Sequence, residues 1–335
     1  MSRSAAPKRT KKQHYVPRLH LRRFAGYRPA GMLWTYDLAR GVARPSKPME
    51  TGAQNNFYSV HDETGAYRDD LDLWLQGVED KAAAPYERLL RGEIPRGQER
   101  ADFSTFVASL YARSPATVRN AAEMHGQFVQ MLTNLHWGTR ESFERNLDKY
   151  ESEKGPITVS RDELWEFYND RSQYRIRVDQ SAGLPILGAS DKIQEILFGR
   201  NWCLLEAAED FFITCDSPVF RGLPSDAPPP HPVMGDGGFL NPLAEVTLPL
   251  SPSKMLLLTG RPVPRSPGLV PRADVWRLNR HRAYAAHSFI YAHVRDPRVE
   301  RLANDFREQR PRMKLSGPGD YAPVDVMTRM KSNDT

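Results

Sequence analysis

The sequence predicts an α+β fold in which N-terminal strands join a C-terminal mixed sheet, with a large helical insert between them. Short apolar runs bounded by turn residues indicate strands near the start of the chain, at 32–41 and 56–60, and again from 201 to 260. Between these regions apolar residues recur at helical spacing, over 68–200. With 335 residues, 40% of them hydrophobic, the chain can bury a large core.

We expect three regions along the chain. Residues 1–12 should form a disordered basic arm, residues 13–309 a single α+β domain with the helical insert at 68–200, and residues 310–335 a flexible tail. The arm and the tail are polar and lack the apolar periodicity that a packed element needs.

The N-terminal strands are predicted by alternation and by turn residues. MLWTYDLARG (32–41) alternates its side chains between two faces and ends at Gly41, a turn residue. NFYSV (56–60) is a second short run, rich in the aromatic and β-branched residues that favour strands.

The helical insert is predicted by spacing and by caps. DDLDLWLQGVEDKAAAPYERLLRG has apolar residues at helical spacing and ends at Gly92. Two helices should follow, near 98–113 and 114–136, because Ser114 can cap a new helix with Pro115 at its first position. Ser160 and Glu163 have the capping-box spacing, and the run at 190–200 is again helical.

The C-terminal part returns to strands. Apolar runs at 201–207, 211–215, 245–250 and 254–260 predict four strands, followed by a helix at 271–288, a strand at 289–294 and a last helix from 297. If these strands meet the N-terminal ones, QHYVPRLHLRRF (13–24) lies near TCDSPV (214–219) in space.

Charge is distributed unevenly along the chain. The net charge is +6, and only 11 of the 47 cationic residues are Lys. An Arg bias suits bidentate phosphate contacts, although a GC-rich genome also produces it. Eight Lys or Arg precede Phe24, whereas the first acidic residue is Asp37. This one-sided run indicates an acidic partner, namely nucleic acid or another polyanion.

Composition also bears on compartment and on function class. Cys203 and Cys215 are too few for a disulfide framework or a zinc–thiolate site, which favours a reduced, cytoplasmic protein. We expect no membrane span, because no run approaches about 18 apolar residues, and no secretory signal. No HExxH, GxxxxGK[ST], GxSxG or GxGxxG motif occurs. The sequence carries no signal for an oligomeric state.

Six short motifs occur in one order along the chain, and together they resemble a known family. They are QHYVPRLHLRRF (13–24), NFYS (56–59), VEDKAA (78–83), RSP (113–115), TCDSPV (214–219) and LPLSP (248–252). This set resembles a bacterial family of unknown function that is marked by an N-terminal HYVP motif and a later DSPV motif. The resemblance covers about Gln13 to Asp305 and implies an intracellular bacterial protein, with defence against phage as an expected context.

Polar residues within these motifs are the candidate site residues. His14 could ligate a metal or act as a general base, or it could lock a turn by a backbone hydrogen bond. Asp216 follows an apolar strand, where a rigid element can aim a carboxylate into a site, but Asp-Ser-Pro is also a common turn opener. Glu79 is a ligand candidate or a salt-bridged helix residue. Cys215 lacks a feature that would activate its thiol.

Our leading hypothesis is a metal-dependent nuclease. Glu79 and Asp216 would hold Mg²⁺ or Mn²⁺, His14 would orient or deprotonate water, and three arginines would bind phosphate: Arg22, Arg23 and Arg113. The alternative is a non-catalytic module that binds nucleic acid or protein, in which a buried pair such as Arg113–Glu79 or Arg113–Asp216 belongs to a structural polar network.

Overall fold

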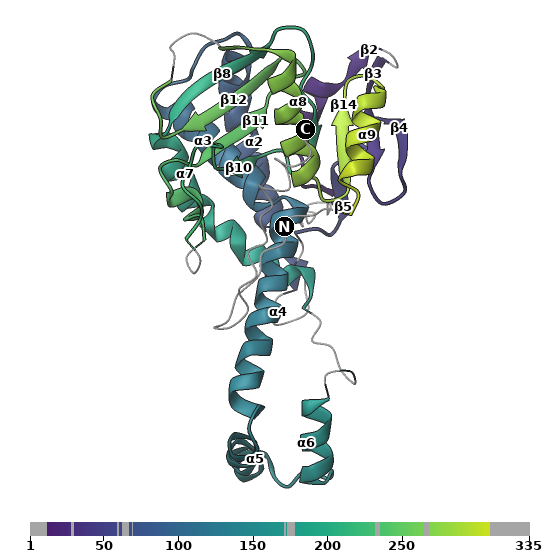
Figure 1. The fold of residues 1–335 in the computed structure, drawn as a ribbon, viewed down its shortest axis with the longest axis vertical. Coiled ribbons are helices and arrows are strands. Elements are labelled where there is room, and N and C mark those ends of the chain that lie inside the picture. The colour runs from purple at the N-terminus through teal and green to yellow at the C-terminus, as the bar shows by residue number, and fades with distance from the viewer. Residues whose placement is uncertain are drawn as a thin grey trace, which may run out of the picture. The chain divides into compact units, whose positions relative to one another are not determined.

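The computed structural model describes residues 12–27, 30–58, 60–61, 67–68, 70–170, 172, 178–231, 235–263 and 268–308 (Figure 1). Apart from Lys12, the predicted arm lies outside these residues, as does the predicted tail at 310–335. The α+β class is confirmed, with N-terminal strands, a helical middle and a C-terminal mixed sheet.

The described residues form helices and strands with the following bounds. The α-helices are α1 (Arg18–Leu21), α2 (Asp70–Leu90), α3 (Gly97–Ala112), α4 (Pro115–Trp137), α5 (Arg140–Lys154), α6 (Arg161–Asn169), α7 (Ser190–Gly199), α8 (Arg272–Ala285) and α9 (Pro297–Asp305), with 3-10 helices η1 (Arg22–Phe24), η2 (Gln180–Ala189) and η3 (Gly238–Leu240). The strands are β1 (Lys12–His14), β2 (Gly26–Tyr27), β3 (Ala30–Asp37), β4 (Val42–Ser46), β5 (Ala53–Asn55), β6 (Val60–His61), β7 (Tyr67–Arg68), β8 (Asn201–Ala207), β9 (Thr214–Cys215), β10 (Phe220–Gly222), β11 (Glu245–Pro249), β12 (Lys254–Thr259), β13 (Gly268–Val270) and β14 (Phe289–Ala292).

These elements belong to two compact units. The first takes the described residues up to Val118 and those from Pro185 onward, and it contains all the strands in the described part of the chain. The second spans Arg119–Leu184. The single domain expected at 13–309 stays a prediction.

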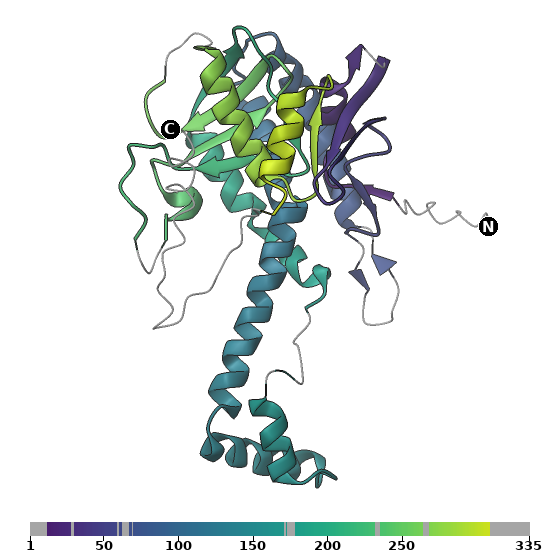
Figure 2. The same cartoon turned by 45° about the vertical axis from the view of Figure 1, so that its right-hand side comes forward.

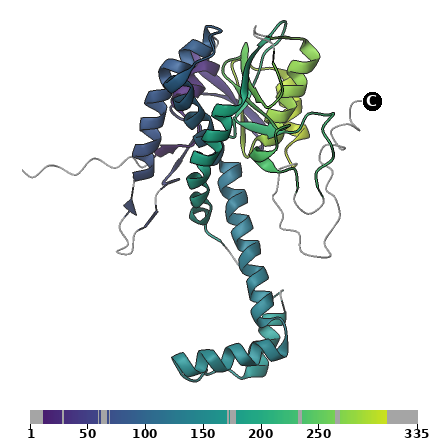
Figure 3. The ribbon, with the colours of Figure 1, turned by 90° about the vertical axis from the view of Figure 1, so that its left-hand side faces the viewer.

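One of the two five-stranded sheets of the first unit has helices on both faces. Its strand order is β10-β11-β12-β8-β13, with β13 parallel to β8 and the other pairs antiparallel. Because side chains alternate along a strand, Leu204 and Leu256 pack with α2, α3 and α7, whereas Leu205 and Met255 lie on the face that packs against α8. Figure 3 shows α2 and α3 (blue) on one side of the strands and α8 and α9 (green to yellow) on the other.

The second sheet of this unit joins the two ends of the chain. Its order is β2-β3-β14-β9, and β4 pairs with β3. Tyr36 in β3 is in register with Ile290 in β14, which is in turn in register with Cys215 in β9. Helix α9 packs on this sheet next to α8 (Figure 2). The expected meeting of residues 13–60 with the C-terminal strands is therefore confirmed.

The second unit consists of helices in the described part of the chain. Helix α4 continues into it, and α5 and α6 begin with capping boxes at Thr139 and Ser160, the latter as predicted. Trp137, Phe143 and Tyr168 pack together. The rings of Trp137 and Tyr168 are stacked with 5.4 Å between their centroids, and the ring centroids of Trp137 and Phe143 lie 5.8 Å apart. No helix in the described residues is long and apolar enough to cross a membrane.

Two strand predictions were wrong in detail. The run at 56–60 was expected as a strand, but Asn56, Phe57 and Tyr58 form a turn between β5 and β6, with Asn56 at φ 56°. The side chains of Phe57 and Tyr58 are buried in the core, and their backbone does not pair with a neighbouring strand. The run at 211–215 contributes only Thr214–Cys215 to a sheet.

Gly52 holds the turn on which the N-terminal segment lies. Its carbonyl accepts a hydrogen bond from the Val16 amide at 3.0 Å, and its φ is +64°. A Cβ there would come within 2.9 Å of Leu21 and 3.1 Å of Val16. Only glycine satisfies both the conformation and the close approach.

We expect Gly52→Ala to lower the free energy of unfolding by about 1–3 kcal/mol, because it adds left-handed strain and a steric clash. Gly77→Ala is the matched control. Gly77 lies inside α2, where an added Cβ meets nothing within 4 Å, and the change should stabilise by about 0.5–1 kcal/mol. Urea unfolding of both variants checks this, and equal effects would contradict the close packing at Gly52.

Candidate functional site

Residues 12–24, here called the motif segment, include the candidate residues His14, Arg22 and Arg23. Strand β1 pairs with β5, so that His14 is in register with Ala53. Pro17 follows at the N-cap of α1, with φ −59° and ψ 144°, because proline fixes φ and lacks the N–H that would be unpaired there. Val16, Leu21 and Phe24 are fully buried, so this side of the segment belongs to the core.

His20 connects the motif segment to two distant elements. Its Nδ1 lies 3.0 Å from the Tyr86 hydroxyl in α2, and its Nε2 lies 2.8 Å from Thr214 Oγ1 in β9. The Tyr86 hydroxyl donates to the Leu250 carbonyl at 2.9 Å, so it must accept from His20 Nδ1–H. Nε2 then accepts from Thr214, which defines the neutral Nδ1–H tautomer. Burial, followed by the charges of Arg113 and Arg282, lowers the pKa of His20 to about 3.

His14 lies among cations at the edge of the core. Burial lowers its pKa to about 4, and the charges of Lys12, Arg18 and Arg113 act in the same direction, against a hydrogen bond with the Met49 backbone. Its Nε2 is buried and has no hydrogen-bond partner in the described structure. His14 is therefore a neutral imidazole in a positive environment.

Glu79 and Arg113 are brought together, as one of the two pairs anticipated from the sequence. Arg113 follows α3 as its C-cap and is fully buried, and its Nη1 donates to Glu79 Oε1 at 2.8 Å. The Glu79 side chain is 25% exposed. Arg113 Nε and Nη2 have no hydrogen-bond partner among the described residues. The pair neutralises a charge that would be costly to bury alone.

Asp216 fastens the turn between α8 and β14. It is fully buried, and its carboxylate accepts from the amides of His287 at 2.7 Å, Ser288 at 2.6 Å and Phe289 at 3.0 Å. The Asp216 amide donates to the Phe289 carbonyl at 3.0 Å. Because hydrogen bonds to a carboxylate are stronger than neutral ones, three backbone N–H donors hold this distant turn firmly against Asp216.

The motif segment and the TCDSPV segment also meet through Tyr15. Burial, and then the Asp216 carboxylate, raise the pKa of Tyr15. The neighbouring Cys215 is fully buried, and burial followed by the same carboxylate raises the pKa of its thiol, so it is not an activated nucleophile.

The arginines of the motif segment differ in their surroundings. Arg23 pairs with Glu87 and lies 5.9 Å from the centroid of Tyr86. Arg22 is exposed, as are Lys12 and Arg18, and these three form no ion pair with any residue that the structure describes. Of the three predicted phosphate ligands, Arg22 is thus accessible, Arg23 is engaged by an acid and Arg113 is buried.

The predicted metal ligands are poorly suited to a metal as they stand. The carboxylate oxygens of Asp216 accept three backbone amides, and Glu79 accepts from Arg113. Across the described ranges, no group of three or more His, Cys, Asp and Glu side chains could hold a metal ion. Binding of Mg²⁺ or Mn²⁺ by Glu79 and Asp216 stays a prediction, and it would require both carboxylates to give up these donors.

Two buried residues that shape this region were not among the residues predicted for the site. One is His20, which lies in the motif but has no local signal for its partners. The other is Arg282, which is fully buried in α8 and donates to the carbonyls of Pro218 at 2.6 Å and Thr247 at 2.9 Å. Burial lowers the pKa of Arg282 to about 10. Its helical sequence, RHRAYA, gave no sign that the second arginine points inward.

The fold and this region define an α+β protein whose N-terminal motif is anchored by a buried polar network. A family model described as a protein of unknown function, DUF4238, matches residues 12–296, and the chain belongs to this family. The match confirms the resemblance to a family of unknown function. No curated protein matches the chain. No solved structure matches it either.

We expect Asp216→Asn to lower the free energy of unfolding by about 3 kcal/mol, because an amide leaves one acceptor oxygen and directs its own N–H toward backbone donors. Asp274→Asn is the control, since Asp274 is a partly exposed residue of α8 that pairs with Arg277. It should change stability by less than about 0.5 kcal/mol. Urea unfolding measures both, and a harmless Asp216→Asn would argue against a structural role.

Proposed function

We propose that the protein binds nucleic acid through phosphate contacts from the exposed basic side of its motif segment, and that the buried motif residues maintain this surface. The observation that carries the proposal is a group of exposed cations in the motif segment, namely Lys12, Arg18 and Arg22. They form no ion pair with any residue that the structure describes, and Lys12 and Arg18 act on the pKa of His14. Arg18 and Arg22 are four residues apart in continuous helical turns, so they lie on one side. Phosphate is the ligand that such cations favour.

The surroundings of His14 support an anionic ligand. The three side-chain charges that act on its pKa are all cationic. A phosphate oxygen near His14 would reduce the repulsion between these cations. The family resemblance adds a bacterial cytoplasmic setting, with defence as its context, to the proposal.

The binding role is favoured over the nuclease mechanism by the state of the two carboxylates. Asp216 is fully buried under three amide donors, and Glu79 is paired with Arg113. These contacts support the non-catalytic alternative, in which such residues belong to a structural polar network.

The test is binding of fluorescent single-stranded RNA and DNA across a salt series. Wild-type affinity should fall linearly on a log–log plot, and Arg18→Gln with Arg22→Gln should reduce the slope by about 0.7 per arginine. The matched control replaces Arg44 and Arg96, two exposed arginines outside the motif segment, by Gln. This control should keep most of the affinity.

Three outcomes would contradict the proposal: binding that does not respond to salt, no binding at low salt, or an equal loss in the control.

The same samples also test the nuclease mechanism when Mn²⁺ is added. Glu79→Gln keeps an acceptor for Arg113 but removes the charge that a metal needs. Cleavage by the wild type that this variant abolishes would replace the binding role by catalysis.

A further inference from the structure

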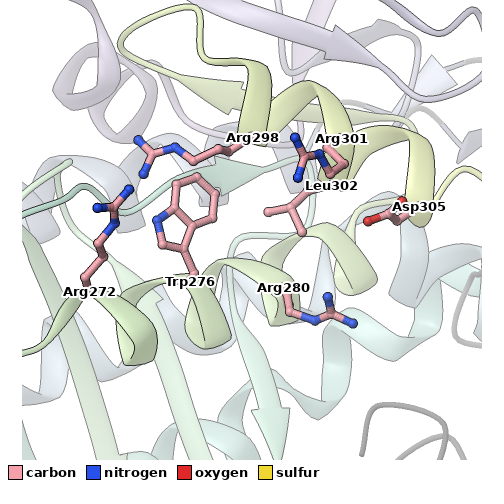
Figure 4. Close-up of a pocket in the computed structure, with 7 residues that line it drawn as sticks. All are labelled: Arg272, Trp276, Arg280, Arg298, Arg301, Leu302 and Asp305. Atoms are coloured by element: carbon pink, nitrogen blue, oxygen red, sulfur yellow. The ribbon is translucent and has the colours of Figure 1, made fainter. Parts of the chain in front are cut away.

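A groove between α8 and α9 gathers arginines around an aromatic ring (Figure 4). Helix α8 contributes Arg272, Trp276 and Arg280 at intervals of four residues, which places them on one face. Helix α9 contributes Arg298, Arg301 and Leu302 to the opposite wall. The cavity has a volume of about 260 Å³. This α8–α9 groove is separate from the motif segment in the sequence and in the residues that form it.

One end of the groove is fixed by Asp210. This carboxylate is 4% exposed and accepts from Trp276 Nε1 at 2.7 Å and from Arg298 Nη1 at 2.6 Å. The Arg298 guanidinium lies 4.4 Å from the centroid of Trp276, so it covers the ring. Arg272 Nε lies 3.4 Å from the same carboxylate. The indole is therefore held in one orientation before any ligand arrives.

The other end of the groove has uncompensated positive charge. Arg280 and Arg301 form no ion pair with any residue in the described part of the chain, although Arg280 lies 5.6 Å from the ring centroid of Phe306. Of the four arginines that line this space, Arg272 and Arg298 contact Asp210, and Arg298 also pairs with Asp296, which leaves the charges of Arg280 and Arg301. Gathering like charges is unfavourable unless an anion binds between them, and guanidinium groups match phosphate geometry.

We propose that the α8–α9 groove binds a nucleoside phosphate, with the phosphate on Arg280 and Arg301 and the base against Trp276 and Leu302. Its volume is below the roughly 300–1,000 Å³ of pockets for drug-sized ligands, which suits one nucleotide with its remainder in solvent. Asp305 is the only carboxylate among the lining residues, and it can accept from ribose hydroxyls or a base amino group. A plain polyphosphate or an acidic peptide does not match the arginines, the apolar surface of Trp276 and Leu302, and the Asp305 carboxylate at the same time.

This inference goes beyond nucleic-acid binding by the motif segment and does not depend on it. A nucleoside phosphate can be a free nucleotide or the 5′-phosphorylated end of a strand. Both have the same chemistry at the groove, and the experiment separates them.

The test is calorimetric titration of the full chain with AMP, ATP and inorganic pyrophosphate, and with short oligonucleotides that carry a 5′-phosphate or a 5′-hydroxyl. The nucleotides, the 5′-phosphorylated strand or both should bind, and pyrophosphate should bind more weakly. Replacing Arg280 and Arg301 by Gln should weaken binding about tenfold or more. Arg277→Gln is the matched control, because Arg277 is on α8 but outside the groove and pairs with Asp274. It should bind as the wild type does.

The Arg18→Gln and Arg22→Gln variant should also retain nucleotide binding, which makes failure of this proposal distinguishable from failure of the motif-segment proposal. No binding of either nucleotide or of the 5′-phosphorylated strand in the millimolar range would overturn the inference. An equal loss in Arg277→Gln would do so too. If pyrophosphate binds as tightly as ATP, the proposed contact between the base and Trp276 is wrong. If polyglutamate at equal charge displaces ATP, the groove binds acidic peptides instead.

Discussion

The buried imidazole of His20 is the constraint on which the rest of this protein depends. It joins α1 to α2 through Tyr86 and to β9 through Thr214, and Tyr86 extends the chain of hydrogen bonds to the Leu250 carbonyl. Each proton in this series of hydrogen bonds has one acceptor. Removal of any of the side chains therefore leaves a buried polar atom unpaired. The position of the motif segment against the core follows from this chain.

Two buried arginines give the network its electrostatic character. Arg113 has Glu79 as a partner, whereas Arg282 is held mainly by backbone carbonyls and the Thr247 hydroxyl. Their charges help to keep His20 neutral. Buried acids, bases and arginines of this kind are also the components of active sites, which explains why a sequence with these motifs suggests catalysis. Here three backbone amides hold the carboxylate of Asp216, and Glu79 is the partner of Arg113. The accessible charges are elsewhere, on Arg18, Arg22 and the α8–α9 groove.

What could be predicted from the sequence was what local chemistry determines. Ser114 and Pro115 mark the start of α4, and Ser160 and Glu163 form the capping box of α6, because caps act over three residues. The partners of His20 are 66 and 194 residues away, and no local pattern could identify them. Phe57 and Tyr58 looked like strand residues because strands and buried turns favour the same aromatic side chains. The predicted strands at both ends of the chain did indicate that the two ends meet, although not that Asp216 would hold a turn 71 residues away.

The α8–α9 groove could not be predicted from the sequence for a related reason. Arg272, Trp276 and Arg280 follow one another at four-residue spacing, but the same spacing of polar and aromatic residues occurs on many surface helices. Only the packing of α9 against α8 places Arg298 and Arg301 opposite them. A pair of helices that each carry arginines has no special meaning until their faces are known.

The most direct test of the central claim is to measure the protonation state of His20. The ¹⁵N chemical shifts of its ring report this state in the intact protein as pH is lowered. The structure predicts a neutral ring with the proton on Nδ1 at pH 7, which stays neutral through about pH 5 because its pKa is lowered to about 3. A ring that gains a second proton near the ordinary histidine pKa of about 6.5, or one that carries its proton on Nε2, would contradict the buried chain of hydrogen bonds from Thr214 to Leu250.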